Sequence, residues 1–473
     1  MVLHTLFATS PRRRGYASVI RAFLCAALMH ATASHAQTLT WGPATLVNQA
    51  CVKCNTQKGD LKVSLSGNAV AVWVQNDGVP DIAAARYDAV AGVWRGFKTL
   101  YQGVHEGEFV GVQNPRLVMD SDGNVMAFWT EVASSTVFYA RYRASDATWT
   151  LPATLHVGTG FRDPELAVGN DALGNVFVHW NEDESRRLMV KRYDTASRTW
   201  SASIPVTQNV SLQRATMAVD LLGNAMVIWQ RESDNCIIYS RYTKRTGQWS
   251  APRFAARAST PSGVQIVLDN AGNGTVFFKT GTPTETDPYA LLSAARYDAA
   301  SDRWSGPRVL QSPSKIVFNY DYVVDAKNNV MLITGELDNF SSQTILLARR
   351  FNARTGQWSM PIKLTGTPSR IGVVDMTLDQ RGNIVAILHQ SRLVPESPIN
   401  AVFIRKGTVR FDNASQQWGA VKMLASETYE AYFFAAGVDV TGKVIALYQQ
   451  DSGYRWHDTL IYEMRAHQIT TNR

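Results

Sequence analysis

The chain has 473 residues, 45% of them hydrophobic and 18% charged, and a formal net charge of +8. Four arginines and no acidic residue fall within residues 1–36, so the remainder carries 43 lysines and arginines against 39 acids. This near balance, without a run of basic residues, argues against a nucleic-acid-binding protein, and we expect no nucleic-acid partner.

Residues 1–36 have the order of segments found in a secretory signal peptide. Arginines at 12–14 supply positive charge, residues 22–28 begin a short apolar stretch, and small residues run up to Ala36. The apolar stretch is too short to span a bilayer, and no later segment is apolar enough to do so. The sequence therefore predicts a signal peptide over 1–36 and no membrane span. It also predicts a single domain over 37–473 that is exported, either periplasmic or secreted.

Three cysteines follow residue 36, two of them in the segment Cys51-Val52-Lys53-Cys54. A redox motif of this kind is expected beside a βαβ unit, which the pattern lacks, and a zinc site needs a second pair of ligands. In an oxidising compartment the segment predicts a local disulfide between Cys51 and Cys54, with Cys236 left as a thiol. We expect no metal site and no cofactor.

A Gly-Asn turn between two apolar runs recurs along the chain. It stands at Gly67-Asn68, Gly123-Asn124, Gly174-Asn175, Gly223-Asn224, Gly272-Asn273 and Gly382-Asn383, with variants at Asn328-Asn329 and Gly442-Lys443. A tryptophan series of the same length alternates with it, at Trp41, Trp94, Trp149, Trp200, Trp249, Trp304, Trp358 and Trp418. Successive copies are 49 to 60 residues apart, a period typical of repeat arrays and propellers.

In seven copies an Asp stands three positions before the first residue of the turn, as Asp120 does before Gly123. An Asp at this position can accept hydrogen bonds from backbone amides within the turn, and Gly-Asn tolerates the positive φ of a tight hairpin. The distal ligands of a calcium loop are missing. We therefore interpret these aspartates as turn residues.

The second half of each copy is another hairpin, for which Arg192-Tyr193-Asp194 leading to Trp200 serves as the example. Four short strands per copy make one blade of a β-propeller. The eighth copy lacks its last strand, and residues 39–46 supply such a strand without a blade of their own. The sequence predicts an all-β, eight-bladed propeller closed by pairing of the N-terminal strand with the C-terminal blade. Seven blades is the alternative.

The segment from Tyr193 to Trp200, Tyr-Asp-x-x-x-x-x-Trp, resembles the second hairpin of kelch repeats in seven copies. It departs from kelch where Trp129-Thr130-Glu131 replaces the Gly-Gly pair. A weaker similarity exists to the Asp-box hairpins of sialidase-like propellers, and the whole repeat most resembles exported bacterial propellers. This resemblance implies the fold; it implies no activity, because one fold hosts unrelated functions.

Residues that recur in every blade are expected to be scaffold. The tryptophan series should pack between neighbouring sheets, and so should the aromatic residues six positions after the first residue of a turn, which are Trp73, Trp129, Trp180, Trp229, Phe278 and Tyr448. The recurring arginines should stack on aromatic rings or pair with an Asp. The arginines are Arg86, Arg141, Arg192, Arg241, Arg296, Arg350 and Arg410.

Binding residues are expected where the copies differ, in loops on the channel face of the ring. Polar residues stand eight positions after the first residue of each turn, where the strand ends, and include Glu131, Glu182, Arg231 and Glu336. Solvation of strand ends is the alternative explanation for them. Segments expected to be lengthened loops add Tyr320, Asp321, Tyr432 and Trp456. Aromatic faces beside carboxylates suit sugar rings, and equally a protein interface.

These features predict a binding or scaffold module, a monomer whose channel face holds a carbohydrate or a protein partner. The alternative is a polysaccharide-acting hydrolase or lyase of sialidase-like type. For that chemistry Glu131/Glu182 or Asp321/Asp375 offer paired carboxylates, which would have to lie about 5–10 Å apart in one pocket. No Gly-rich phosphate loop or nucleophile elbow occurs in the sequence, and no catalytic residue is assigned.

Overall fold

A computed structural model describes seventeen stretches of the chain. They are residues 39–48, 54–76, 78–103, 105–106, 109–158, 165–182, 187–207, 213–231, 233–258, 262–281, 291–312, 315–338, 344–367, 370–393, 402–429, 432–456 and 459–471. The chain divides into two units, Met1–Ala36 and Gln37–Arg473. The first unit lies outside the described residues, so the signal peptide stays a prediction.

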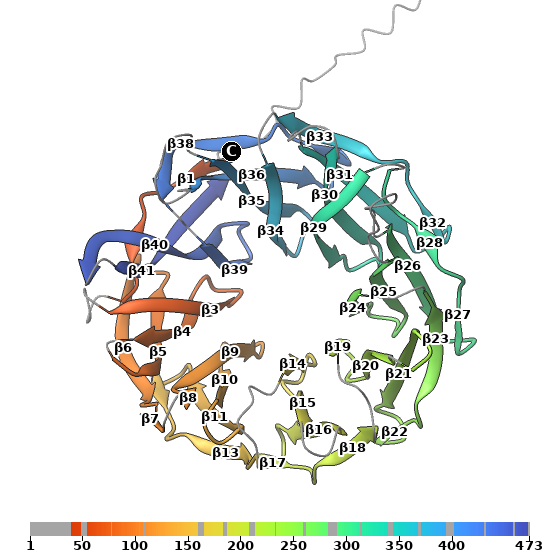
Figure 1. The fold of residues 1–473 in the computed structure, drawn as a ribbon, viewed down its shortest axis with the longest axis horizontal. Coiled ribbons are helices and arrows are strands. Elements are labelled where there is room, and N and C mark those ends of the chain that lie inside the picture. The colour runs from red at the N-terminus through yellow and green to blue at the C-terminus, as the bar shows by residue number, and fades with distance from the viewer. Residues whose placement is uncertain are drawn as a thin grey trace, which may run out of the picture. The chain divides into compact units, whose positions relative to one another are not determined.

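The second unit is a ring of eight antiparallel sheets, which confirms the eight-bladed propeller (Figure 1). Each blade is named here by its place in the chain, from blade 1 (β3 to β6) to blade 8 (β39 to β41 with β1 and β2). Every regular element in the described stretches is a strand, and none of them contains a helix that could cross a membrane.

The four strands of a blade run from the channel outward. The innermost strands are β3 (Asn55–Val63), β9 (Val112–Met119), β14 (Leu166–Asn170), β19 (Gln213–Val219), β24 (Ser262–Leu268), β29 (Lys315–Val324), β34 (Arg370–Leu378) and β39 (Tyr432–Val438). The second strands are β4 (Ala69–Asn76), β10 (Val125–Glu131), β15 (Val176–Glu182), β20 (Ala225–Arg231), β25 (Gly274–Thr280), β30 (Val330–Asp338), β35 (Ile384–Leu393) and β40 (Val444–Trp456).

The third strands are β5 (Pro80–Asp88), β11 (Thr136–Arg143), β16 (Arg187–Asp194), β21 (Cys236–Thr243), β26 (Leu291–Asp298), β31 (Thr344–Asn352), β36 (Val402–Asp412) and β41 (Thr459–Thr471). The outermost strand is continuous in blade 1 as β6 (Val93–Tyr101) and interrupted in the other blades. Its parts are β12 (Thr148–Trp149), β13 (Ala153–His156), β17 (Thr199–Trp200), β18 (Ile204–Thr207), β22 (Gln248–Trp249), β23 (Arg253–Arg257), β27 (Arg303–Trp304), β28 (Arg308–Val309), β32 (Gln357–Trp358), β33 (Ile362–Thr367), β37 (Gln417–Trp418), β38 (Lys422–Tyr429), β1 (Leu39–Trp41) and β2 (Thr45–Leu46). A short extra hairpin joins β7 (His105–Glu106) and β8 (Phe109–Val110).

The recurring Asp stabilises the turn that joins the first and second strands. Asp120 Oδ1 accepts hydrogen bonds from the backbone amides of Asp122 and Asn124 at 3.0 and 2.9 Å, and its Oδ2 accepts one from the Asn124 side chain at 3.0 Å. Gly123 has a φ of 80°, which favours glycine. Asn124 also accepts a hydrogen bond from the amide of Ala144 in the next hairpin. The interpretation of these aspartates as turn residues is confirmed.

The two ends of the propeller unit close the ring. β1 pairs with β41 from Leu39 opposite Thr471 to Trp41 opposite Ile469, and β2 continues the pairing along the same strand. Blade 8 is therefore completed by a strand from the other end of the unit, as the sequence predicts. This pairing removes the free sheet edges that an open array would expose.

The core lies in the joints between neighbouring blades, because the second strand of each blade is buried on both faces. Four of the largest side chains there, Trp73, Trp129, Trp180 and Trp229, are at most 2% exposed. The recurring arginines stack on rings of the next blade: Arg241 lies 5.5 Å from the centre of Tyr297, and Arg296 lies 4.8 Å from that of Phe351. The scaffold roles expected for these residues are confirmed.

Candidate functional site

Two of the predicted strand-end acids are buried and hydrogen-bonded within the blades. Glu131 accepts hydrogen bonds from Tyr101 Oη at 2.7 Å and Ser134 Oγ at 2.6 Å. Glu336 is 1% exposed and forms an ion pair with Arg349 at 3.0 Å. Both carboxylates therefore stabilise the scaffold in the arrangement that the structure describes.

The other two charged strand-end residues also have local partners. Glu182 lies 3.6 Å from His156 Nε2, and burial lowers the pKa of this histidine, against the attraction of Glu182. Arg231 forms an exposed ion pair with Asp234 at 2.6 Å. Many of the loops between these strand ends lie outside the described residues, so a binding site on the channel face stays a prediction.

Residues 317–322, expected to be part of a lengthened loop, instead lie in the innermost strand β29 of blade 6. The physical reason is that the aromatic residues Phe318, Tyr320 and Tyr322 recur at every second position, a period that favours a strand over a loop. Tyr320 Oη donates a hydrogen bond to the carbonyl of Gly263 in blade 5 at 2.9 Å. Tyr432 and Trp456 also lie in strands, β39 and β40, and their side chains lie outside the described residues.

Asp321 and Asp375, one of the acid pairs named from the sequence, lie on the neighbouring innermost strands β29 and β34. Burial raises the pKa of Asp321 well above its ordinary value, and the charge of Asp375 raises it further. Burial also raises the pKa of Asp375, to about 6, against the backbone hydrogen bond from Ala436. The two acids are thus close enough for their titrations to depend on each other.

These acids also connect successive blades. Asp375 accepts a hydrogen bond from the backbone amide of Ala436 in blade 8, and in blade 1 Asp60 accepts one from Leu117 of blade 2 at 2.8 Å. Asp321 accepts one from Met376 of blade 7 in the same way. Each carboxylate therefore satisfies an amide at the exposed edge of the next innermost strand, which is a structural role.

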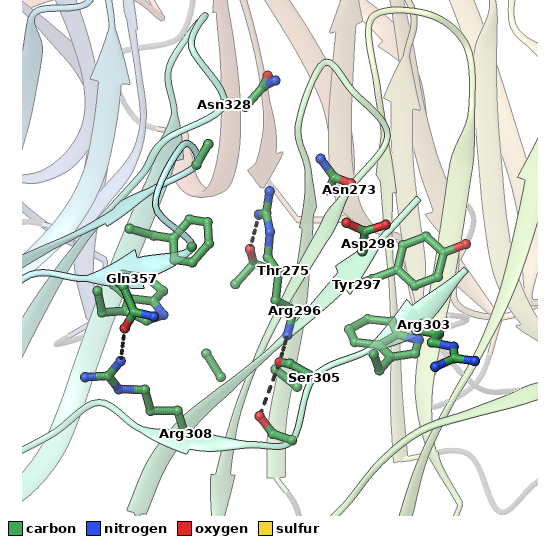
Figure 2. A pocket seen from close by; sticks show the side chains of 18 of the residues that line it. Asn273, Thr275, Arg296, Tyr297, Asp298, Arg303, Ser305, Arg308, Asn328 and Gln357 are labelled. Carbon is green, nitrogen blue, oxygen red and sulfur yellow. Dashed lines mark hydrogen bonds between the residues drawn. The ribbon is translucent and has the colours of Figure 1, made fainter. Parts of the chain in front are cut away.

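A groove of about 600 Å³ opens between blades 5 and 6, on the side of the Gly-Asn turns (Figure 2). The corresponding cavities between blades 2 and 3 and between blades 6 and 7 measure about 30 and 10 Å³. Polar groove residues include Asn273, Thr275, Arg296, Ser305, Arg308, Asn328 and Gln357. The joint between blades 5 and 6 is therefore open where others that the structure describes are nearly filled.

One wall of the groove is aromatic. Trp358 lies 5.5 Å from Phe351 of its own blade and 6.2 Å from Phe277 of blade 5, so the indole faces blade 5. Trp358 is partly exposed, whereas Phe351 is buried. The tryptophan thus offers part of a flat apolar surface to a ligand in the groove.

The charge of Arg296, in the middle of the groove, is compensated within the protein. Its guanidinium forms an ion pair with Asp269, whose side chain is fully buried, and donates to Thr275 Oγ1 at 2.6 Å. Figure 2 shows Asn273 and Asn328 toward one end of the groove and Arg308 with Gln357 toward the other. The Arg296 side chain therefore acts as part of the wall.

Arg308 at the far end is exposed, and its guanidinium donates a hydrogen bond to Gln357 Oε1 at 3.5 Å. Among the described residues it has no carboxylate partner. The one acid in the lining, Asp298, accepts hydrogen bonds from the amide and the hydroxyl of Ser301. Nothing in the sequence patterns pointed to this groove, because it depends on small residues in two different blades.

Cys54 is disulfide-bonded, and Cys236 is a buried free thiol. Cys51 lies outside the described residues, so the pairing of Cys51 with Cys54 stays a prediction. The described stretches contain no cluster of three or more His, Cys, Asp or Glu side chains that could hold a metal ion.

No protein-family model matches the chain, and no curated protein matches it. Among solved structures it is similar to an ulvan lyase, a polysaccharide lyase, with 11% identity and a TM-score of 0.46 over 78% of this chain and 93% of the lyase. A protein of unknown function from Dyadobacter fermentans gives 11% identity and a TM-score of 0.40 over 92% and 99% of the two chains. A fungal alcohol oxidase in complex with copper gives 12% identity and a TM-score of 0.48 over 91% of this chain and 76% of the oxidase. At these identities the likeness is one of fold.

Proposed function

We propose that this chain is an exported carbohydrate-binding propeller that holds a sugar in the groove between blades 5 and 6. The observation that carries the proposal is the groove itself, about 600 Å³ in volume, whereas the cavities in two other joints measure about 30 and 10 Å³. That volume lies within the range of about 300–1,000 Å³ that is usual for small-molecule sites.

The lining of the groove suits a sugar. The partly exposed indole of Trp358 gives a flat apolar surface for the C–H face of a sugar ring. The side-chain amides of Asn328 and Gln357 and the guanidinium of Arg308 supply hydrogen-bond donors for ring hydroxyls. An aromatic surface beside several hydrogen-bonding groups is a combination that sugars require.

The same features favour a sugar over a protein partner and over hydrolysis. A stable protein interface buries on the order of 1,000 Å² or more, whereas this groove is a narrow concave joint between two blades. The paired acids Asp321 and Asp375 accept amides of the blades that follow them, which gives them a structural task. Binding without chemistry therefore needs the fewest additional assumptions.

Residues 37–473 should be tested against a panel of oligosaccharides by glycan array and isothermal titration calorimetry. We expect Trp358→Ala to weaken binding about tenfold or more, because the stacking surface is lost. Trp149→Ala is the matched control, since Trp149 holds the same position in blade 2. Thermal unfolding of both variants checks that they remain folded. Absence of any glycan binding, or equal effects of the two substitutions, would contradict the proposal.

A further inference from the structure

In the joint between blades 4 and 5, side chains fill the space that corresponds to the groove between blades 5 and 6. Asp302 accepts a hydrogen bond from Tyr297 Oη at 2.6 Å and forms an ion pair with Arg253 of blade 4 at 2.5 Å. The Arg253 guanidinium lies 5.8 Å from the ring centre of Tyr239, which itself packs edge-on against Trp304 at 5.4 Å. A ring, a hydroxyl and a carboxylate thus fill this joint.

The strand registers identify the equivalent positions one joint further on. Tyr297 pairs with Trp304 as Phe351 pairs with Trp358, which makes Gly356 the counterpart of Asp302. In the preceding blades, Tyr239 pairs with Arg253 as Ala294 pairs with Arg308. The correspondence can therefore be drawn residue by residue.

Three of these positions have lost the groups that fill the joint between blades 4 and 5. Ala294 replaces the ring of Tyr239, Phe351 replaces Tyr297 without its hydroxyl, and Gly356 replaces the carboxylate of Asp302. The arginine is kept, as Arg308. A Cβ at Gly356 would meet no atom within 4 Å, so the backbone at this position borders open space where Asp302 carries its side chain in the other joint.

From these three replacements we infer that the groove binds an acidic sugar, a hexuronate unit, whose carboxylate pairs with Arg308. This inference rests on the proposed carbohydrate-binding function and deepens it. The sugar supplies what the joint lacks: a six-membered ring, hydroxyl groups and a carboxylate. Charge-assisted hydrogen bonds between a guanidinium and a carboxylate are among the stronger contacts that a partly exposed site can make.

The distribution of charge in the lining agrees with this assignment. Arg296 is neutralised by Asp269, and Asp298 is engaged by Ser301, so neither competes for the ligand's charge. Arg303 lies on the same side of the groove as Tyr297, away from Gln357 (Figure 2). Arg308 is therefore the cation placed to meet a carboxylate at the end of the groove.

The test compares oligomers of galacturonate and mannuronate with neutral oligomers of galactose and mannose by calorimetry at low and moderate salt. We expect the acidic oligomers to bind with an affinity about tenfold or more above that of the neutral oligomers. The affinity of the acidic oligomers should fall as the salt concentration rises. Arg308→Gln should reduce their affinity to that of the neutral oligomers, because the uncharged amide keeps hydrogen bonding and loses the ion pair.

Gly356→Asp is the second variant. It would place in the groove a carboxylate like that of Asp302, which fills the joint between blades 4 and 5. Gly356 has a φ of 67° and Asp302 a φ of 55°, so an aspartate is compatible with this backbone. We expect G356D to abolish binding of the acidic oligomers. Gly247→Asp, at the equivalent position of blade 4 with a φ of 68°, makes the same chemical change outside the groove and should leave binding intact.

The possible failures are distinguishable. If acidic and neutral oligomers bind equally, and Arg308→Gln changes neither, the acidic-sugar inference is wrong while the carbohydrate-binding function stands. If no oligomer binds, or if G356D and G247D have equal effects, the groove is not a sugar site and both proposals fail. 4-Hydroxybenzoate is included in the same titrations as an aromatic acid. If it binds more tightly than any uronate, the ligand of the groove is an aromatic acid and the acidic-sugar inference is wrong.

Discussion

The carboxylate of Asp375 accepts a hydrogen bond from the backbone amide of Ala436, across the joint between blades 7 and 8. Asp60 does the same for Leu117 across the joint between blades 1 and 2. An innermost strand has one edge without a strand partner, so its amides need other acceptors. Side-chain carboxylates supply such acceptors at several places in this ring. Burial of their charge should lower the free energy of unfolding by a measurable amount.

Substitution of Asp375 by Asn should therefore stabilise the propeller above pH 6. The pKa of Asp375 is raised to about 6 from an ordinary value of 3.8, so between these two values the folded protein holds a proton that the unfolded chain has released. Stability from this group is full at low pH and falls as pH rises through that window, by up to about 3 kcal/mol. Asparagine keeps an acceptor oxygen for Ala436 without the charge.

Urea unfolding of Asp375→Asn and the parent at pH 4 and pH 8 measures this difference. The variant should be more stable at pH 8, and the gap should be small at pH 4, where the acid is protonated in the folded protein. A variant that is less stable than the parent at pH 8 would show that the negative charge itself is needed at this position.

A second prediction concerns His179, which is fully buried and has neither ring nitrogen hydrogen-bonded in the described structure. Burial lowers its pKa from 6.5 to about 4. Between these values the unfolded chain takes up a proton that the folded protein refuses, so stability falls as pH falls through this window. The expected loss between pH 7 and pH 4 is about 3 kcal/mol.

Phenylalanine is the matched replacement, because Phe128 and Phe277 hold the same place in blades 2 and 5. We expect His179→Phe to remove this part of the acid sensitivity and to raise stability at pH 7 by about 1–3 kcal/mol, since an unsatisfied buried polar group is lost. Thermal unfolding between pH 4 and pH 8 tests both effects. An unchanged slope of stability against pH would mean that His179 is solvated or protonated in the folded state.

Most of the fold could be predicted from the sequence, because propeller blades are specified by short-range patterns. The turn at Asp120 and Asn124 needs only residues four positions apart, and the strand that holds Trp41 is recognisable because it has no blade of its own. The segment around Tyr320 was misassigned as a loop for the opposite reason. It departs from the other copies in composition, and its pairing with β30 places it as the innermost strand of blade 6.

The candidate groove was out of reach of the sequence patterns. Its lining includes the small residues Ala294 and Gly356, which belong to different blades and are far apart in the chain. Ala294 and Gly356 stand out only beside Tyr239 and Asp302, which hold the equivalent positions one joint earlier. The residue types at these positions vary between copies. Two positions before each tryptophan, Asp302 is the one aspartate, whereas Gly356 is one of three glycines with Gly92 and Gly247. The pairing of Asp302 with Arg253 is visible only in the structure.

The turn aspartates give a third prediction, directed at stability without binding. Asp220 accepts hydrogen bonds from the amides of Leu222 and Asn224 and from the Asn224 side chain. Asp220→Ala should cost about 1–3 kcal/mol, because these donors lose their acceptor in a partly buried turn. Sugar affinity of the folded fraction should not change, since this turn lies in blade 4, outside the groove. Loss of binding in a fully folded variant would place the site at the turns instead.

Ring closure gives the last prediction. Removal of residues 37–48 takes away β1 and β2 and leaves β41 with an unpaired edge along its outer side. We expect this truncated protein to lose more stability than the contacts of Trp41 alone supply, and to self-associate, because an exposed edge pairs with other chains. Trp418→Ala is the control: it removes the equivalent tryptophan of blade 7 and leaves every strand paired. A synthetic peptide of residues 37–48, added in trans, should restore the melting temperature by supplying the missing strand. Size-exclusion chromatography and thermal unfolding measure both effects, and a truncated protein that stays monomeric and melts with the parent would show that closure contributes little.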